Sequence, residues 1–215
     1  GLAIGVGCGT WAALKQRIRF IGEQNHTGPT PMAARKDALL AAAHGIVAVR
    51  AEADLHGTQL HGSVGRLEIY PNSPNVVPSS VTLHVEYRSP DTELLAAAGA
   101  RLDAALKATA TATATDYTIE SCALREPTHL HHGFAELAYS VGQQLGLPIG
   151  NSVTVSGHDA ISLSRHYPVC LLFIPSSNGV SHNEAEFTSE QDMRNGLHML
   201  TALLHRACST PNAYR

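Results

Sequence analysis

Apolar and polar residues alternate in two segments of the chain with the period of two that is typical of half-buried β-strands. Residues 11–21 have an apolar face and a basic face, formed by Leu14, Ile18 and Phe20 and by Lys15, Arg17 and Arg19. Residues 81–88 repeat the pattern, with Val81, Leu83, Val85 and Tyr87 alternating with Thr82, His84, Glu86 and Arg88. Each segment is therefore predicted to be a strand with one buried face.

Helical spacing of apolar residues marks two other segments. Residues 31–49 are rich in Ala and Leu, and Pro31 suits the first turn of a helix there. Residues 94–108 form a second amphipathic pattern. The low-complexity run TATATAT at residues 109–115 is interpreted as a loop that leads into a last strand.

Shorter strand patterns at residues 65–70 and 116–124 complete the first part of the chain. The resulting order is strand, helix, strand, strand, helix, strand, which is the split βαβ, or ferredoxin-like, pattern. We expect one such domain to cover residues 10–124.

A different composition begins near Arg125. Two helices are predicted there, at residues 132–145 and 189–206, and one buried strand at residues 169–174. Two loops are predicted at residues 151–160 and 175–187. They indicate an α/β layer, but one convincing strand cannot make a sheet of ordinary size. We therefore expect residues 125–215 to be the C-terminal part of a larger catalytic α/β domain, with the βαββαβ domain inserted and residues 1–9 as the tail of its N-terminal segment.

Charge and composition indicate a small molecule as the ligand. The 15 Lys and Arg against 18 Asp and Glu give a formal net charge of −3, so no field of one sign favours nucleic acid or an anionic membrane as a partner. No apolar run approaches the roughly 20 residues that span a bilayer, and the protein is predicted to be soluble and cytoplasmic. The four cysteines lack CxxC spacing, so free and mostly buried thiols are expected.

His26 lies in the segment GEQNHTGPTPM, a Gly- and Pro-rich turn predicted between a strand and a helix. Taken alone, a His in a loop is more often structural than catalytic, but further segments change this interpretation. The chain resembles the hydantoinase/carbamoylase group of amidohydrolases, relatives of the metal-dependent aminoacylases and aminopeptidases, in four segments that follow the same order: GEQNHTGPTPMAARKDAL, PNSPNVVPSSVTLHVEYRSPD, SGHDA and FIPSSNGVSHNEAEFTSEQDM. Four ordered matches over nearly the whole chain make the resemblance specific.

The resemblance implies hydrolysis of a C–N bond in an N-carbamoyl amino acid or a related ureido acid, at a binuclear centre of divalent metal ions such as Zn, Mn, Co or Ni. Ureido carbonyls are poor electrophiles, and a metal ion polarises the carbonyl and lowers the pKa of a bound water. Of the family's metal ligands only the last His is matched, by His182 in GVSHNEAE. The other ligands and the acidic general base are expected in a missing upstream segment, so the chain alone is predicted to be inactive, with its metal centre absent or incomplete.

The resemblance also implies roles for residues of the βαββαβ domain, which corresponds to the family's lid. His26 matches the His that hydrogen-bonds the substrate carbonyl or the oxyanion, while Asn75 and Arg88 match residues that bind the substrate carboxylate. Because the family's lid also dimerises, a homodimer through this domain is expected. Without the resemblance, Arg88 would be assigned to an ion pair with Glu86 or Asp91, and Asn75 to a turn.

Gly157, His158 and Asp159 match the end of the family's Ser-Gly-x-Gly-His-Asp-Ala loop, in which the glycine backbone approaches the substrate and polar side chains brace the site. The chain departs from this pattern at Val155, where the first Gly is expected, and this departure bears on the geometry of the loop.

Three other functions fit parts of the sequence. Ser156 with His158 or His182 would form a nucleophile and base, but the Gly-x-Ser-x-Gly elbow is lacking. The ferredoxin-like domain would also suit a non-catalytic module for dimerisation or ligand binding. A peptidase or deacylase of the same superfamily is the third alternative.

Overall fold

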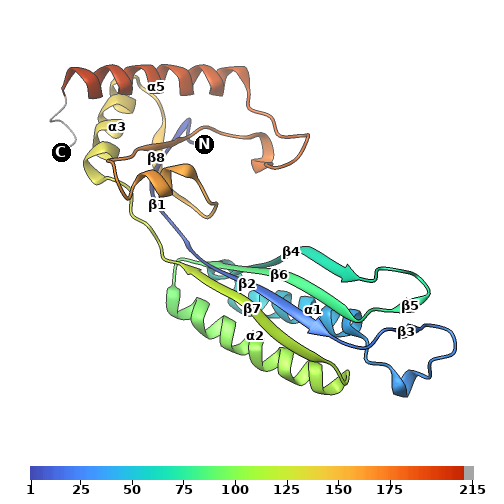
Figure 1. The fold of residues 1–215 in the computed structure, drawn as a ribbon. Helices are drawn as coiled ribbons and strands as arrows, with labels where there is room; N and C mark the ends of the chain where they lie inside the picture. Colours follow the sequence, from blue (N-terminus) through green and yellow to red (C-terminus); the bar gives the residue numbers. More distant parts are fainter. Residues whose placement is uncertain (211–215) are drawn as a thin grey trace. The chain divides into compact units, whose positions relative to one another are not determined.

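The computed structural model describes residues 1–210 and contains two compact units (Figure 1). Unit 2 is continuous in sequence and covers Trp11–Pro127. Unit 1 combines Gly1–Thr10 with the chain from Thr128 onward. The chain therefore leaves unit 1 after Thr10, builds unit 2, and then returns to complete unit 1.

Unit 2 is built on a four-stranded antiparallel sheet. In spatial order its strands are β4 (His61–Tyr70), β6 (Ser80–Ser89), β2 (Ala12–Ile21) and β7 (Asp116–Arg125). Helix α1 (Ala38–His56) lies between β2 and β4 in the sequence, and helix α2 (Thr92–Ala112) lies between β6 and β7. The predicted order of strands and helices in this segment is confirmed.

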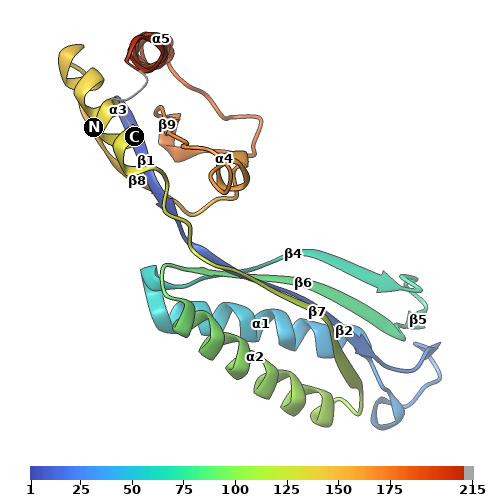
Figure 2. The ribbon, with the colours of Figure 1, turned by 60° about the vertical axis from the view of Figure 1, so that its left-hand side comes forward.

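Both helices of unit 2 cover the same face of this sheet (Figure 2). The apolar residues that alternate along β2 and β6 point to that face and are buried, including Ile18, Phe20, Leu83 and Tyr87. They pack against apolar side chains of both helices, among them Leu95, Leu102 and Leu106 of α2. The predicted buried faces of the two strands are therefore confirmed, and burial of this apolar surface is the main force that stabilises unit 2.

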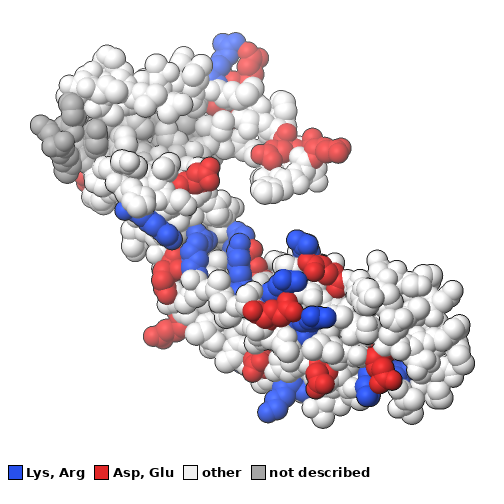
Figure 3. Space-filling view, viewed as in Figure 1, with Lys and Arg blue, Asp and Glu red and all other residues white. Residues whose placement is uncertain are grey.

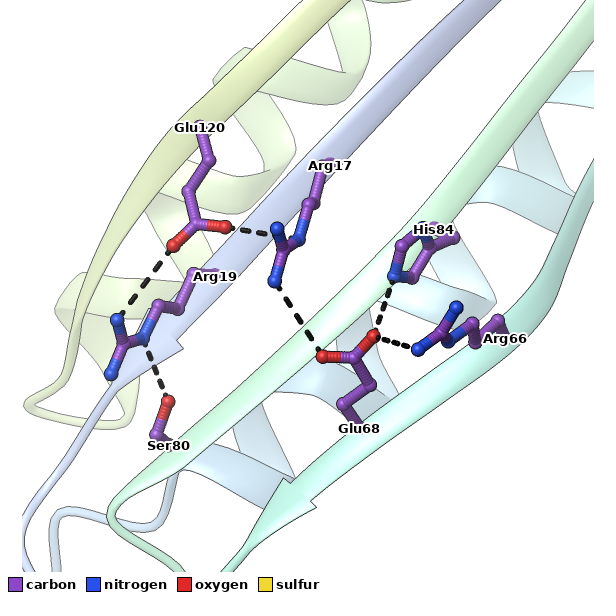
Figure 4. A network of polar contacts seen from close by, with 7 residues as sticks. All are labelled: Arg17, Arg19, Arg66, Glu68, Ser80, His84 and Glu120. Carbon is purple, nitrogen blue, oxygen red and sulfur yellow. Dashed lines mark hydrogen bonds and ion pairs between the residues drawn. The ribbon is translucent and has the colours of Figure 1, made fainter.

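The other face of the sheet carries a charged network (Figure 4). Arg17 of β2 contacts Glu68 of β4 at 3.6 Å and Glu120 of β7 at 3.1 Å, and Arg19 shares Glu120 at 3.7 Å. A hydrogen bond of 3.0 Å between His84 and Glu68 holds the pKa of this carboxyl below its ordinary value. Such exposed ion pairs stabilise a fold little, but they order the side chains on the uncovered face.

Two helix ends differ from the predicted ones. α1 begins at Ala38 and not near Pro31, because the Asp37 carboxylate accepts hydrogen bonds from the backbone N–H groups of Leu39 at 2.9 Å and Leu40 at 3.1 Å. The preceding residues Met32–Ala34 form a separate 3₁₀ turn, η1. α2 continues into the TATATAT run as far as Ala112, so a loop was the wrong prediction there; alanine has the highest helix propensity, and Ala110 is buried.

Unit 1 contains a three-stranded sheet in the order β8-β1-β9. Its central strand β1 (Ile4–Thr10) pairs in parallel with β8 (Ile149–Thr154) and antiparallel with β9 (Leu171–Phe173). Residues 151–154 therefore belong to a strand and not to the predicted loop. Their backbone groups are paired with β1, a distant segment whose position cannot be inferred from local sequence.

In the described part of unit 1, up to residue 210, the α-helices are α3 (His132–Gln144), α4 (Asp159–Leu163) and α5 (Glu190–Ser209). α3 and α5 confirm the two predicted helices, and their buried side chains pack with those of β1. α5 also carries four exposed apolar side chains, those of Met193, Leu197, Leu200 and Leu204. These side chains line a groove of about 600 Å³ together with residues from β9 and its flanks.

The four cysteines are free, as predicted, but none of them is buried. Cys8 and Cys170 are half-buried, whereas Cys122 lies on the edge strand β7 and Cys208 in the last turn of α5, and both are exposed. The prediction of mostly buried thiols was therefore wrong, because it rested on residue type and not on position in the sheet.

Charge is distributed without a large patch of one sign on the drawn face of unit 2 (Figure 3). Basic and acidic side chains lie side by side there, in keeping with the small net charge of −3. Within residues 1–210, no helix is long and apolar enough to cross a membrane.

Candidate functional site

His26 and Asn75 lie in two loops that meet at one end of unit 2. Strand β3 (Asn25–His26) pairs with β5 (Val76–Val77), so that His26 is opposite Val76. The backbone N–H of Thr27 donates to the carbonyl oxygen of Asn75 at 3.0 Å. These bonds bring the two predicted substrate-binding residues together, although they are far apart in the sequence.

The His26 imidazole is oriented by its own turn. Its Nδ1 atom accepts a hydrogen bond of 2.9 Å from the backbone N–H of Gly28. A neutral ring with an accepting Nδ1 carries its proton on Nε2, so the exposed His26 ring presents an N–H donor. Arg35 braces the turn because its guanidinium donates to the carbonyl oxygens of Thr27 and Thr30. The geometry suits a donor to a carbonyl oxygen or an oxyanion.

Gly22 anchors this loop to the rest of unit 2, a role that sequence reasoning missed. Its N–H donates to the carbonyl oxygen of Ser79 at 2.8 Å, and the N–H of Glu23 donates to the carbonyl oxygen of Lys36 at 2.9 Å. A Cβ atom at Gly22 would lie 2.1 Å from that same oxygen. The only signal in the sequence was a glycine between a strand and the His26 turn.

Arg88 lies at the other end of the sheet, near the end of β6. Its guanidinium is paired with Glu86 at 2.9 Å, which is the ion pair expected for Arg88 without any functional role. Burial works to raise the pKa of Glu86, but the hydrogen bond from Arg88 and the charges of Arg88, Lys15 and Arg125 hold it below its ordinary value. Arg88 is half-buried, and the ion pair with Glu86 orders its guanidinium.

The structure separates Arg88 from His26 and Asn75 within one chain. The loop with Asn75 leads into β6 at Ser80, and Arg88 follows eight residues later in the same extended strand. At about 3.4 Å per residue, Arg88 is about 27 Å from the start of β6. The three predicted substrate-binding residues of the lid therefore do not form one site in a single molecule.

Gly157 and His158 lie in unit 1, in the turn between β8 and α4. His158 caps α4, because its Nδ1 accepts a hydrogen bond of 3.0 Å from the backbone N–H of Ala160. A Cβ atom at Gly157 would meet nothing within 4 Å, so packing in this structure does not require glycine there. Both residues are exposed, and no hydrogen bond joins the Ser156 hydroxyl to a His anywhere in residues 1–210. The structure thus gives no support to a Ser nucleophile.

His182 lies in the loop between β9 and α5 of unit 1. Its φ angle of 54° is in the left-handed region, which is uncommon for residues other than glycine. Its backbone N–H donates to the Glu186 carboxylate at 3.0 Å. A hydrogen bond of 2.8 Å from the backbone N–H of Ser177 to the carbonyl oxygen of Phe187 closes the loop. The exposed imidazole is thereby carried on a constrained backbone, an arrangement that is common at functional sites.

The described residues do not fit a metal centre on their own. Over residues 1–210, no group of three or more His, Cys, Asp and Glu side chains is placed to hold a metal ion. A divalent ion needs several such ligands, and His182 alone would be a single one.

Comparison with known proteins relates the whole chain to hydrolases. A hydrolase of Mycolicibacterium smegmatis is 38% identical over 95% of this chain and 47% of its own length. The allantoate amidohydrolase of Bacillus subtilis is 30% identical over 88% of the chain and 46% of its own length. The N-carbamoyl-L-amino acid amidohydrolase of Geobacillus stearothermophilus is 28% identical over 93% of the chain and 49% of its own length. The chain thus spans about half the length of these relatives.

A solved structure agrees with the sequence comparison. An amidase of the hydantoinase/carbamoylase family from Burkholderia vietnamiensis is 31% identical, with a TM-score of 0.91, over 96% of this chain and 50% of that one. The predicted resemblance to this group is thereby confirmed. The model of peptidase family M20/M25/M40 matches residues 4–206. The chain belongs to this family.

Proposed function

We propose that this chain is the substrate-binding part of a metal-dependent amidohydrolase that cleaves a C–N bond in an N-carbamoyl amino acid or a related ureido acid. The observation that carries the proposal is the exposed His26 imidazole, whose Nδ1 accepts from Gly28 so that Nε2 becomes the donor. The descriptions of the two named relatives, an allantoate and an N-carbamoyl-L-amino acid amidohydrolase, support the same reaction class.

In this proposal His26 acts on the carbonyl oxygen that gains negative charge. Attack of water on a ureido carbonyl turns its oxygen into an oxyanion, and a donor held in place beforehand stabilises that charge most strongly in the transition state. The bond from Gly28 to Nδ1 leaves Nε2–H as the donor of the ring. Asn75, joined to the same turn through Thr27, is proposed to orient the substrate by its amide.

Arg88 is proposed to bind the substrate carboxylate. Its planar guanidinium can take a carboxylate through two parallel hydrogen bonds, and its pairing with Glu86 orders the side chain in advance. Arg88→Ala in the complete enzyme is expected to raise KM about tenfold or more and to change kcat little. Steady-state kinetics on an N-carbamoyl amino acid measures this. Arg17→Ala, which removes another Arg from the inner strand β2 of the same sheet, is the control, and an equal KM for both variants would contradict the role.

The distance of about 27 Å along β6 between Ser80 and Arg88 supports a homodimer through unit 2. We take unit 2 as the ferredoxin-like lid. A small ureido acid cannot contact both ends of one lid. Pairing of two equal edge strands around a two-fold axis is antiparallel, and it places the Arg88 end of one lid beside the His26 end of the other. We favour the β4 edge, because α1, which packs against β4, exposes Leu40, Val47 and Leu55.

Val47→Asp is expected to convert this dimer into monomers, because it places a charge on the apolar outer face of α1, where Val47 is 66% exposed. Sedimentation equilibrium of the chain and its variant measures the mass. Ala104→Asp on the exposed side of α2 is the matched control and should leave the dimer intact. A monomeric unchanged chain, or a variant as dimeric as the unchanged chain, would count against this interface.

The remaining half of the enzyme is proposed to pack on unit 1. The relatives are about twice as long as this chain, and the exposed apolar face of α5 and its groove of about 600 Å³ would suit such a segment. Unit 1 would then be the C-terminal part of the catalytic domain, with His182 as one metal ligand and the loop of Gly157 and His158 beside the substrate. The metal ions, whose other ligands would come from the added half, would supply an activated water.

The decisive experiment compares residues 1–215 with a protein of the relatives' length that contains them. With added Mn, Co, Ni or Zn, the longer protein is expected to release ammonia from N-carbamoyl-L-amino acids, N-carbamoyl-β-alanine or allantoate, and the chain alone is expected to be inactive. Dipeptides and N-acyl amino acids test the peptidase or deacylase alternative. Hydrolysis of those compounds without hydrolysis of any ureido acid would reject the proposed substrate class.

A further inference from the structure

We propose that Arg125 forms, together with Arg88, a two-arginine site for the carboxylate of the substrate. The inference deepens the proposed function and rests on it, since it starts from the carboxylate that Arg88 is proposed to bind. It assigns a role to Arg125, the last residue of β7, for which the sequence suggested none.

The sheet register places both arginines in one row on the uncovered face. Ala13 of β2 is directly opposite Arg88 of β6 on one side and Arg125 of β7 on the other. Residues in such a row point to the same face of a sheet, and the two Cα atoms are two strand spacings, about 10 Å, apart. The alanine between them ends at Cβ, and it is only 1% exposed. Two long guanidinium side chains can therefore converge over it.

Positive side chains predominate in this row and the next. Arg88, Lys15 and Arg125 all stabilise the negative charge of Glu86, whose carboxylate is 2.9 Å from Arg88 and 3.7 Å from Lys15. Within residues 1–210, the Nη1 atom of Arg125 is buried without a hydrogen-bond partner. A buried donor of this kind is costly unless something accepts from it. A second carboxylate, brought by a ligand, would accept this bond and balance the charge.

The electrostatics of Arg125 agree with the geometry. Burial and the nearby positive charge of Arg88 lower the pKa of Arg125, and Glu86 only partly offsets them. Both effects penalise the charged guanidinium while no anion is bound. A ligand carboxylate would remove this penalty, whereas a neutral amide of the same shape would not.

The test is a binding experiment with the chain of residues 1–215. The probes are N-carbamoylglycine and its neutral analogue N-carbamoylglycinamide, and binding is followed by the NMR signals of the arginine Nε–H groups. Arg125→Ala is expected to weaken binding of the acid at least about tenfold and to leave binding of the amide unchanged. Arg125→Lys keeps the charge and loses the planar fork, so it should bind the acid more weakly than the unchanged chain and more tightly than Arg125→Ala. Glu86→Gln, which removes the competing negative charge but keeps an oxygen that can accept from Arg88 and order it, should tighten binding of the acid.

Arg17→Ala is the control for the loss of one positive charge from the same face, and it should bind the acid as the unchanged chain does. Thermal unfolding of each variant checks that unit 2 is intact. If Arg88→Ala weakens binding of the acid and a folded Arg125→Ala does not, the two-arginine site is overturned while the proposed function stands. An unchanged chain that does not prefer the acid to the amide would also overturn the site, because both arginines belong to unit 2; the hydrolysis of ureido acids by the longer protein tests the proposed function independently.

Discussion

Replacement of His26 by alanine in the complete enzyme is expected to lower kcat about 100- to 1000-fold, with a much smaller change in KM. The reason is that the Nε2–H of His26 would donate to an oxygen that carries a full negative charge only after water has attacked. The side chain is exposed, and its one hydrogen bond within the turn is with the N–H of Gly28. Its loss should therefore affect the transition state far more than the fold.

The variant Lys107→Ala is the control, because Lys107 is exposed on α2 of the same unit, away from the α1 face of the proposed dimer, and has no proposed role. Both variants should unfold at the temperature of the unchanged protein. His26→Asn should recover part of the rate, since its amide can accept from Gly28 and still offer an N–H. A kcat for His26→Ala within threefold of that of Lys107→Ala would show that His26 does not stabilise the oxyanion.

Gly22→Ala is expected to be the most destabilising single change near the site. The new Cβ atom would lie 2.1 Å from the carbonyl oxygen of Lys36 and 2.9 Å from the backbone nitrogen of Ala38. Both neighbours are backbone atoms that cannot rotate away, so the loop must move and the bond from Glu23 to Lys36 must break. We expect a loss of about 3 kcal/mol or more in the free energy of unfolding of unit 2, or more than about 10 °C in Tm.

The matched control for this prediction is Gly65→Ala on β4. A Cβ atom at Gly65 would meet nothing within 4 Å, so the change in stability should stay within about 0.5 kcal/mol. Urea unfolding of both variants, with the longer enzyme assayed in parallel, separates the two effects. Because Gly22 holds the loop of His26, Gly22→Ala should also lower activity at temperatures where unit 2 remains folded. Equal stability of the two glycine variants would show that the backbone at residue 22 adapts freely.

The chemistry of the site was partly accessible from sequence because some of it is local. The turn around His26 is encoded by its own Gly and Pro residues, and the bond from Gly28 spans two positions. The link between His26 and Asn75 was suggested only by resemblance, because it depends on pairing between β3 and β5. Arg125 had no recognisable pattern, since its significance comes from Arg88 on a strand that is not adjacent in the sheet.

The sequence by itself determined the faces and most of the elements of this protein. Period-two alternation defined which side of β2 and β6 is buried, and helical spacing identified α1, α2, α3 and α5, because burial of apolar side chains is decided residue by residue. The tertiary structure alone decided which segments are neighbours. It made a strand of residues 151–154, placed Arg125 in the row of Arg88, and put about 27 Å of strand between Arg88 and the loop of His26 and Asn75. Hydrogen bonds between distant strands set these relations, and periodicity along the chain carries no information about which strands will pair.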